Sequence, residues 1–293
     1  MERGLYIVPT PIGNLGDMTQ RALETLAQAT LIAAEDTRHS RRLLAHYGID
    51  TPLTGYHEHS EPEVTQRLLE RMVAGDAIAL ISDAGTPLVS DPGFRLVRAA
   101  QEAGIPVVPL PGPCAAVTAL SAAGLPSDRF FFEGFLPAKP GARRSRLQAL
   151  LSQQGTLIIY EAPHRIAATL EDAVQVMGDD REAAVARELS KAFETIRRGT
   201  LKDLLSWVAG DRNQQRGELV LLIGPMPEPS ASAALAERDQ RLLYRLAQEL
   251  PPRKAAAIVA DHTGQRSRDL YGCLLYTSPS PRDVEESRMP SSA

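Results

Sequence analysis

Residues 77–93 read AIALISDAGTPLVSDPG, a short apolar run followed by a loop of small and polar residues. The apolar run predicts a buried strand, and the loop leads into a helix. Ala84 and Gly85 let the backbone approach a ligand closely, and free amides at a helix start favour an anion such as a carboxylate. Helix capping by Ser90 and Asp91 is the alternative explanation, and it is compatible with ligand binding.

The same pattern of strand, turn and helix repeats on both sides of this stretch. Other β-rich runs in the first 125 residues are followed by amphipathic segments. This alternation is typical of a largely parallel sheet covered by helices, so we expect an α/β domain over residues 1–124. Its strands are predicted at residues 5–8, 31–34, 77–82 and 107–110, with helices that begin near Thr19, Ser40, Pro62 and Gly93.

A hinge at residues 124–128 separates this domain from a second α/β domain over residues 128–225. Short links between consecutive strands, as at residues 189–191, predict antiparallel pairs in the second sheet. Its strands are predicted at residues 130–133, 156–160, 183–187, 193–198 and 218–223, with helices near residues 143–151, 166–176 and 201–208.

A proline-rich linker at residues 225–230 precedes a small helical module at residues 235–271. The last helix of this module is predicted to begin at Ser267. Residues 272–293 interrupt that helix with a glycine and a run rich in serine and proline. We therefore expect residues 272–293 to be a disordered tail that is not native to the protein.

The composition excludes several classes of protein. The chain has 293 residues, 43% of them hydrophobic, and no apolar run approaches the roughly 18 residues of a membrane span. With no secretory signal at its start, a cytoplasmic protein without membrane contact is expected. Two cysteines without metal-ligand spacing argue against a disulfide scaffold and a zinc module, and no metal is expected. A net charge of −4 argues against a non-specific nucleic-acid coat, although a local basic patch can still bind RNA.

Two further loops of small residues follow predicted strands. They lie at residues 9–17 and 111–116, and neither matches the GxGxxG or GxxxxGK[ST] pattern of nucleotide-binding loops. Taken alone, residues 9–17 are better explained as an ordinary turn from a strand to a helix. Cys114 is expected to be a small wall residue, because no basic residue lies near it in sequence to stabilise a thiolate.

The three loops, in this order, resemble the tetrapyrrole methylase fold of S-adenosylmethionine-dependent methyltransferases. Within that fold the chain is most similar to the bacterial ribosomal small-subunit RNA 2′-O-ribose methyltransferases. The similarity spans residues 5–271 and rests on seven motifs: PTPIGNL at 9–15, AEDTR at 34–38, HEH at 57–59, SDAGTPLVSDP at 82–92, GFLP at 134–137, YEAPHR at 160–165 and AREL at 186–189.

This resemblance implies two α/β domains with S-adenosylmethionine held in the cleft between them. It also implies methylation of a cytidine 2′-hydroxyl in 16S ribosomal RNA, in the decoding region of the assembled 30S subunit, by a homodimer. The residues expected around the cofactor are Pro9, Thr10, Pro11, Ile12, Gly13, Asp83, Ala84, Gly85, Val89, Cys114, Ala115, Glu161 and Arg187.

A ribose hydroxyl is a poor nucleophile until a general base takes its proton. His57 with Glu58 is the expected pair, because an imidazole accepts protons near neutrality and a neighbouring carboxylate can orient the ring. A simple ion pair of Glu58 or Asp36 with Arg38 is the alternative reading of these charges.

RNA phosphates require a basic surface. No Asp or Glu lies between Glu133 and Glu161, whereas residues 139–146 carry four positive charges. A solvated helix face is the alternative for such a run. The residues expected to contact RNA are Arg38, Lys139, Arg143, Arg144 and Arg146.

Two other functions remain open at this point. A tetrapyrrole-precursor methyltransferase on the same fold usually carries a GxGxGD-type first loop, whereas residues 9–14 read PTPIGN. A non-catalytic RNA-binding adaptor would use the basic stretch and the helical module. It would have no need for three loops of small residues that converge on one cleft.

Overall fold

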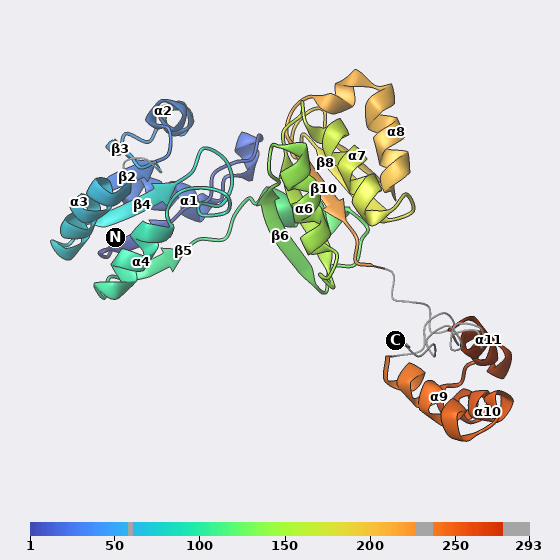
Figure 1. Ribbon diagram of the computed structural model, residues 1–293. Coiled ribbons are helices and arrows are strands. Elements are labelled where there is room, and N and C mark those ends of the chain that lie inside the picture. The colour runs from blue at the N-terminus through green and yellow to red at the C-terminus, as the bar shows by residue number, and fades with distance from the viewer. Residues whose placement is uncertain (58–60, 227–236, 278–293) are drawn as a thin grey trace, which may run out of the picture. The chain divides into compact units, whose positions relative to one another are not determined.

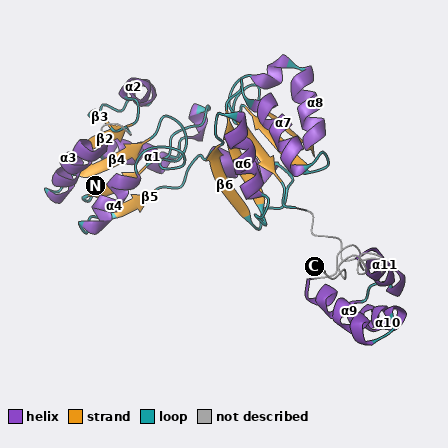
Figure 2. Cartoon of the chain, viewed as in Figure 1, coloured by secondary structure: helices purple, strands orange, loops and turns teal. Residues whose placement is uncertain are grey.

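The computed structural model describes residues 1–57, 61–226 and 237–277 (Figure 1). The chain divides into two units, residues 1–226 and 227–293. Helices and strands alternate through the larger unit, whereas the described part of the smaller unit is helical (Figure 2). No helix in these ranges is both long and apolar enough to cross a membrane.

The first sheet of the larger unit is parallel throughout, as predicted, with strand order β3-β2-β4-β1-β5. Its strands are β1 (Gly4–Ile7), β2 (Leu31–Ala34), β3 (Leu53–Gly55), β4 (Ala77–Ile81) and β5 (Val107–Pro109). All five residues of the central strand β4 are buried, as its apolar run predicts. No residue range was predicted for the edge strand β3, because three half-buried residues give no periodic signal.

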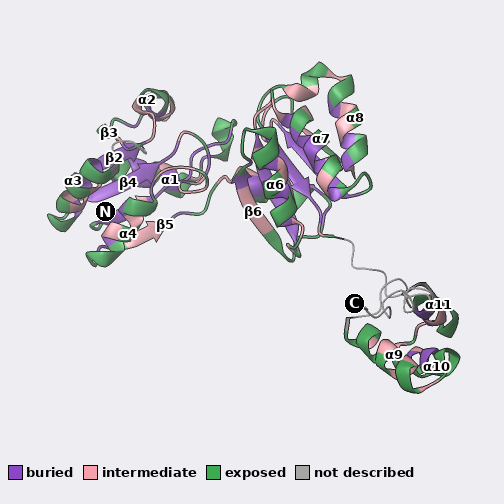
Figure 3. Ribbon diagram, viewed as in Figure 1, coloured by how far each residue is buried: buried purple, intermediate pink, exposed green. Residues whose placement is uncertain are grey.

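Helices cover both faces of this sheet (Figure 3). They are α1 (Gln20–Gln28) and α2 (Thr37–His46) on one face, and α3 (Glu61–Val73) and α4 (Phe94–Glu102) on the other. Helix α2 begins before the predicted Ser40, because the Asp36 side chain accepts a hydrogen bond from the Arg38 amide at 2.8 Å and caps the helix there.

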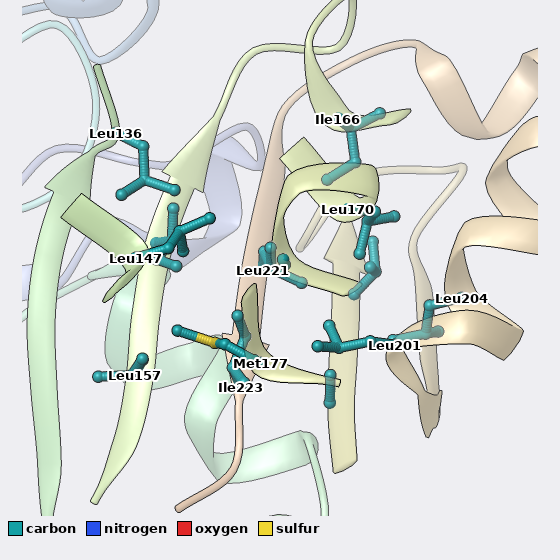
Figure 4. Packing of buried hydrophobic residues seen from close by; sticks show 14 of the residues in the cluster. Leu136, Leu147, Leu157, Ile166, Leu170, Met177, Leu201, Leu204, Leu221 and Ile223 are labelled. Atoms are coloured by element: carbon teal, nitrogen blue, oxygen red, sulfur yellow. The ribbon is translucent and has the colours of Figure 1, made fainter. Parts of the chain in front are cut away.

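The second sheet has the order β6-β7-β10-β8-β9 and contains the predicted antiparallel pairs. Its strands are β6 (Phe130–Phe135), β7 (Thr156–Glu161), β8 (Glu182–Arg187), β9 (Thr195–Thr200) and β10 (Leu219–Ile223). One face is covered by α6 (Pro140–Leu150), α7 (Ile166–Met177) and α8 (Leu201–Gly210). Figure 4 shows their apolar side chains, such as Leu147, Leu170 and Leu204, packed with Leu221 of β10.

The opposite face of the second sheet is covered by α5 (Ala115–Ala122). Ala116, Ala119 and Leu120 of this helix pack with Ile158 and Val220 of the sheet. Helix α5 was not predicted, because its small apolar residues give no amphipathic period. It precedes the expected hinge at residues 124–128, and yet it packs on the sheet that follows the hinge.

The smaller unit is built from α9 (Glu237–Glu249), α10 (Pro252–Thr263) and α11 (Ser267–Thr277). The prediction that the last helix ends before Gly272 was wrong, because α11 continues to Thr277. Leu270 and Leu274 lie four positions apart, so they share one helix face, and both are buried in the module's core. The rest of the expected tail, residues 278–293, lies outside the described residues.

Leu274→Ala should therefore destabilise the module by about 2–4 kcal/mol, because truncation of a buried leucine leaves a cavity. Ile258→Ala is the matched control on α10, where the side chain is 42% exposed, and it should cost less than about 1 kcal/mol. Amide hydrogen exchange over residues 237–277 in the full chain measures the opening of this module separately from the larger unit. Equal protection in both variants would show that Leu274 is not a core residue.

Candidate active site

A cavity of about 400 Å³ lies where loops from both sheets of the larger unit converge. A volume of this size suits a small-molecule ligand. The first sheet contributes the loops after β1, β4 and β5, and the second contributes residues of β7, β8 and β10. Seven residues expected around the cofactor line it: Ile12, Ala84, Gly85, Val89, Cys114, Ala115 and Glu161.

The other expected cofactor residues lie elsewhere. Pro11, Gly13 and Asp83 line a second cavity of about 440 Å³, which shares Ile12, Ala84 and Glu218 with the first. Pro9, Thr10 and Arg187 line neither of these two cavities, and all three are buried. Arg187 is held by the Phe193 carbonyl, to which it donates at 2.9 Å.

Hydrogen bonds fix the three loops relative to one another. Thr10 and Gly85 exchange two backbone hydrogen bonds, of 2.9 and 3.0 Å. The Thr10 hydroxyl donates to the Ser82 carbonyl at 3.1 Å, and the Thr86 hydroxyl donates to the Pro113 carbonyl at 2.8 Å. Thr10 therefore positions the cavity wall without lining the cavity.

Strained backbone is concentrated beside the first cavity. Leu88 and Ser90 have positive φ values of 73° and 70°, and they flank Val89. Glu188 and Ser190, at 50° and 66°, flank Leu189, which also lines the cavity. Such conformations cost on the order of 1–3 kcal/mol each and persist where the surrounding structure requires them. Both strained pairs thus belong to loops that shape this cavity.

Glu161 is a buried anchor of the cavity wall. Its carboxylate accepts hydrogen bonds from the Thr169 hydroxyl at 2.6 Å and from the Ala162 amide at 2.8 Å. Arg165 forms an ion pair with it at 3.1 Å. Because these groups satisfy the carboxylate, Glu161 holds the end of β7 in place.

Tyr160 joins β7 to the start of α5. Its hydroxyl accepts a hydrogen bond from the Ala116 amide at 3.1 Å. Burial raises the pKa of Tyr160 above its ordinary value, so the hydroxyl stays protonated and can still donate to a ligand.

Carboxylates gather at the carboxyl ends of β2 and β4. Asp83 accepts a hydrogen bond from the Asp36 amide at 3.1 Å, and Glu35 accepts one from the Asp83 amide at 3.4 Å. Asp91 lines the first cavity, and no side-chain hydrogen bond caps α4 at Gly93. Burial, together with the charges of Glu35 and Asp83, raises the pKa of Asp91 to about 6.

Of the two residues expected to act as the general base, the structure describes only one. His57 is exposed and lines neither of the two cavities, whereas Glu58 lies outside the described residues. The assignment of His57 and Glu58 as the general base stays a prediction.

The three arginines of the basic stretch of α6 form ion pairs within the fold. Arg143 is 3% exposed and forms an ion pair with Asp172 of α7 at 2.7 Å, and Arg144 reaches the same carboxylate at 3.0 Å. Arg146 binds both oxygens of Glu133, at 2.5 and 2.6 Å. The sequence did not predict these ion pairs, because Asp172 lies outside the acid-free window. Arg143 is buried and therefore unavailable to RNA phosphates, whereas Arg144 and Arg146 are partly exposed and Lys139 is exposed.

Comparison with known proteins places this site in a family. Residues 4–205 match the Tetrapyrrole (Corrin/Porphyrin) Methylases, and residues 233–276 match the RsmI C-terminal HTH domain. Ribosomal RNA small subunit methyltransferase I of Pseudomonas aeruginosa is 57% identical over 91% of this chain and 95% of its own length. The protein of the same name from Escherichia coli O157:H7 is 53% identical, over 92% and 94%. The chain belongs to the ribosomal RNA small subunit methyltransferase I family.

Solved structures agree with this fold. Uroporphyrin-III-C-methyltransferase from Thermus thermophilus superposes with a TM-score of 0.53 at 24% identity, over 75% of this chain and 93% of its own. A structure of that enzyme in complex with S-adenyl homocysteine gives 0.52 at 19% identity, over 75% and 96%. The tetrapyrrole methylase fold and the methyltransferase class expected from the resemblance are thereby confirmed.

The lining of the first cavity in this family member fits the expected cofactor, S-adenosylmethionine. Its charged lining residues are the carboxylates Asp91, Glu161 and Glu218, with no Lys or Arg among its lining residues. Glu161 and Glu218 are paired with Arg165 and Lys191, and no cation in the lining would repel the positive sulfonium group of S-adenosylmethionine. The apolar side chains of Ile12 and Leu189 complete the wall.

Sequence reasoning missed several residues of the wall. Most of them lie inside the quoted motifs, where they could have been assigned: Thr86, Ser90, Asp91, Phe135, Tyr160, Ala162, Pro163, Ala186 and Leu189. Residues 217–220 lie in no motif, and nothing in the sequence of this methyltransferase marks them.

Proposed function

We propose that the chain transfers a methyl group from S-adenosylmethionine to the 2′-hydroxyl of a cytidine in 16S ribosomal RNA. When bound, the cofactor supplies an electrophilic methyl group. The protein must then orient the hydroxyl toward that group and exclude water. The observation that carries the proposal is the cavity between three fixed loops, in a chain 57% identical to a ribosomal RNA small subunit methyltransferase.

The residues that would hold the cofactor are those of the first cavity. Ala84 and Gly85 present backbone without bulky side chains, and Ile12 and Val89 add apolar contacts. The second cavity, which shares Ile12, Ala84 and Glu218 with the first, leaves room for the nucleotide beside the cofactor.

Helix α2 supplies the basic surface that an RNA substrate needs. It carries Arg38, Arg41 and Arg42 and no acidic residue, and all three arginines are exposed. Arg38 lies 3.5 Å from Asp36, whereas no carboxylate of the described chain forms an ion pair with Arg41 or Arg42. Since His39 and Leu43 of the same helix line the second cavity, these charges lie beside the proposed substrate site.

Replacing both Arg41 and Arg42 with Ala should weaken RNA binding about tenfold at moderate salt and reduce the slope of log affinity against log salt by about 2, because two phosphate contacts are lost. The matched control replaces Arg144 and Arg146 of α6, which form ion pairs with Asp172 and Glu133, and it should leave the slope unchanged. Fluorescence anisotropy of a labelled 16S fragment across a salt series measures both variants. A reduced slope for the α6 variant alone would place the RNA surface on α6 and contradict the proposal.

The enzyme works as a homodimer in the cytoplasm, and its substrate is the assembled 30S subunit. These parts of the proposal are supported by the resemblance to the family. Sedimentation equilibrium tests the dimer, and a comparison of methyl transfer to 30S subunits and to naked 16S RNA tests the form of the substrate.

Calorimetry with S-adenosylmethionine, followed by transfer of a labelled methyl group to 30S subunits, tests the function as a whole. Binding followed by transfer to RNA is the expected result. No binding would favour the RNA-binding adaptor, and binding followed by transfer only to a tetrapyrrole precursor would favour the other enzyme of this fold.

A further inference from the structure

Asp91 lies at the wall of the first cavity, and one oxygen of its carboxylate lacks a hydrogen-bond donor. Its Oδ2 atom is buried, and no donor within the described residues forms a hydrogen bond to it. The two other carboxylates of the wall are engaged: Glu161 by Thr169 and Ala162, and Glu218 by Lys191 at 2.9 Å. A buried acceptor without a donor is unfavourable in the free protein, and it gains most when a bound ligand supplies the donor.

The backbone around Asp91 holds this carboxylate in place. Leu88 and Ser90 have left-handed φ values, as does Gly93 at 139°. A Cβ at Gly93 would lie 2.9 Å from the Leu80 side chain, so the chain packs tightly against β4 where α4 begins. Because left-handed residues bracket it on both sides, Asp91 belongs to a conformation that the packing imposes.

The groups that face Asp91 come from both sheets. Glu35 follows β2 and Asp83 follows β4, and each raises the proton affinity of Asp91 through its negative charge. Tyr160 of β7 and Cys114, which precedes α5, line the same cavity, and a hydrogen bond with Ser82 partly offsets the effect of burial. The resulting pKa of about 6 leaves Asp91 mostly ionised at pH 7.5 and able to accept a proton.

We propose that Asp91 is the general base, and that its carboxylate accepts the proton of the ribose hydroxyl that is methylated. The assignment rests on the proposed function. The O–H bond breaks and its proton passes to the Asp91 carboxylate, while the oxygen's electron pair forms the bond to the methyl carbon. The electron pair of the broken carbon–sulfur bond stays on sulfur, which leaves as a neutral thioether. This assignment differs from the expected pair His57 and Glu58.

Single-turnover methyl transfer to 30S subunits across a pH series tests the assignment. The wild-type rate should fall about tenfold per pH unit below pH 6, as Asp91 becomes protonated. The methyl-transfer rate of Asp91→Asn should be lower than the wild-type rate by a factor of about 10² to 10⁴ at pH 7.5, and it should not show the further fall below pH 6. Asp91→Glu should keep part of the wild-type rate. Glu35→Gln should shift the fall in rate to lower pH.

Asp50→Asn is the charge-matched control. Asp50 is exposed and lines neither cavity, so this variant should keep the wild-type rate.

Two measurements do not depend on activity. The affinity of Asp91→Asn for S-adenosylmethionine and for S-adenosylhomocysteine should match the wild type. A raised pKa in the folded state means that ionised Asp91 destabilises the protein above pH 6, so Asp91→Asn should raise Tm at pH 8 and leave it unchanged at pH 4. The second measurement also shows that the variant folds.

A wild-type rate in Asp91→Asn overturns the assignment. So does a selective loss of affinity for S-adenosylmethionine with unchanged affinity for its neutral demethylated product, since Asp91 would then serve the sulfonium charge. If the wild-type chain binds the cofactor and methylates no ribosomal RNA, the proposed function fails, and the assignment that rests on it fails with it.

Discussion

Arg143→Ala should destabilise the larger unit by about 3 kcal/mol or more, because it removes one partner of a buried ion pair. The Arg143 and Asp172 side chains are 4% and 8% exposed. Without the guanidinium, the Asp172 carboxylate stays buried with only Arg144 beside it, at 3.0 Å. Urea unfolding of Arg143→Ala and of the wild type measures the loss of stability. The salt dependence of RNA binding by Arg143→Ala should match that of the wild type.

Arg144→Ala is the matched control for this effect. Its side chain is 42% exposed, so the same carboxylate loses a screened interaction worth about 1 kcal/mol or less. Replacing both Arg143 and Asp172 with leucine should recover most of the stability, since it leaves no unpaired buried charge. Equal stability of Arg143→Ala and Arg144→Ala would contradict the buried ion pair.

Gly85→Val should raise the Kd for S-adenosylmethionine by about 100-fold or more, because displacement of this loop that costs about 3 kcal/mol of cofactor contacts weakens binding by this factor. Gly85 has a φ of 83°, and a Cβ there would lie 3.3 Å from the Ile12 side chain and 3.7 Å from the Pro113 carbonyl. Valine adds two further methyl groups at this meeting point of the three loops. Isothermal titration calorimetry measures the affinity directly.

Gly104→Val separates this effect from backbone strain. Gly104 has a φ of 66°, and no atom lies within 4 Å of a Cβ built there. It therefore carries a similar strain away from the cavity, and it should lower stability while leaving the affinity for the cofactor unchanged. Wild-type affinity in a folded Gly85→Val protein would remove this loop from the site.

The fold could be predicted where the sequence carries a local signal. The apolar run of β4 and the short links of the second sheet gave strand positions and pairing directions that the structure confirms. Helix α5 could not be predicted, because its alanine-rich sequence has no polar face opposite an apolar one. Its place on the second sheet depends on contacts with Ile158 and Val220, which lie far away in sequence.

The site could be predicted on the side of the first sheet and less well on the other. Parallel strands bring the loops after β1, β4 and β5 to one edge, so Ile12, Gly85 and Cys114 could be placed together. No such rule places residues 217–220 of the mixed sheet. The buried ion pair of Arg143 could not be predicted either, because its partner Asp172 comes from another helix.

The most direct test of the proposed function is mass mapping of 16S ribosomal RNA from a bacterial strain that lacks its own enzyme of this family and is complemented with this chain. The predicted result is one cytidine of the decoding region that regains a methyl group on its ribose. Complementation with Asp91→Asn should leave the same cytidine unmodified. Unchanged 16S RNA in the presence of the folded wild-type chain, or a methyl group on a base instead of a ribose, would contradict the proposed function.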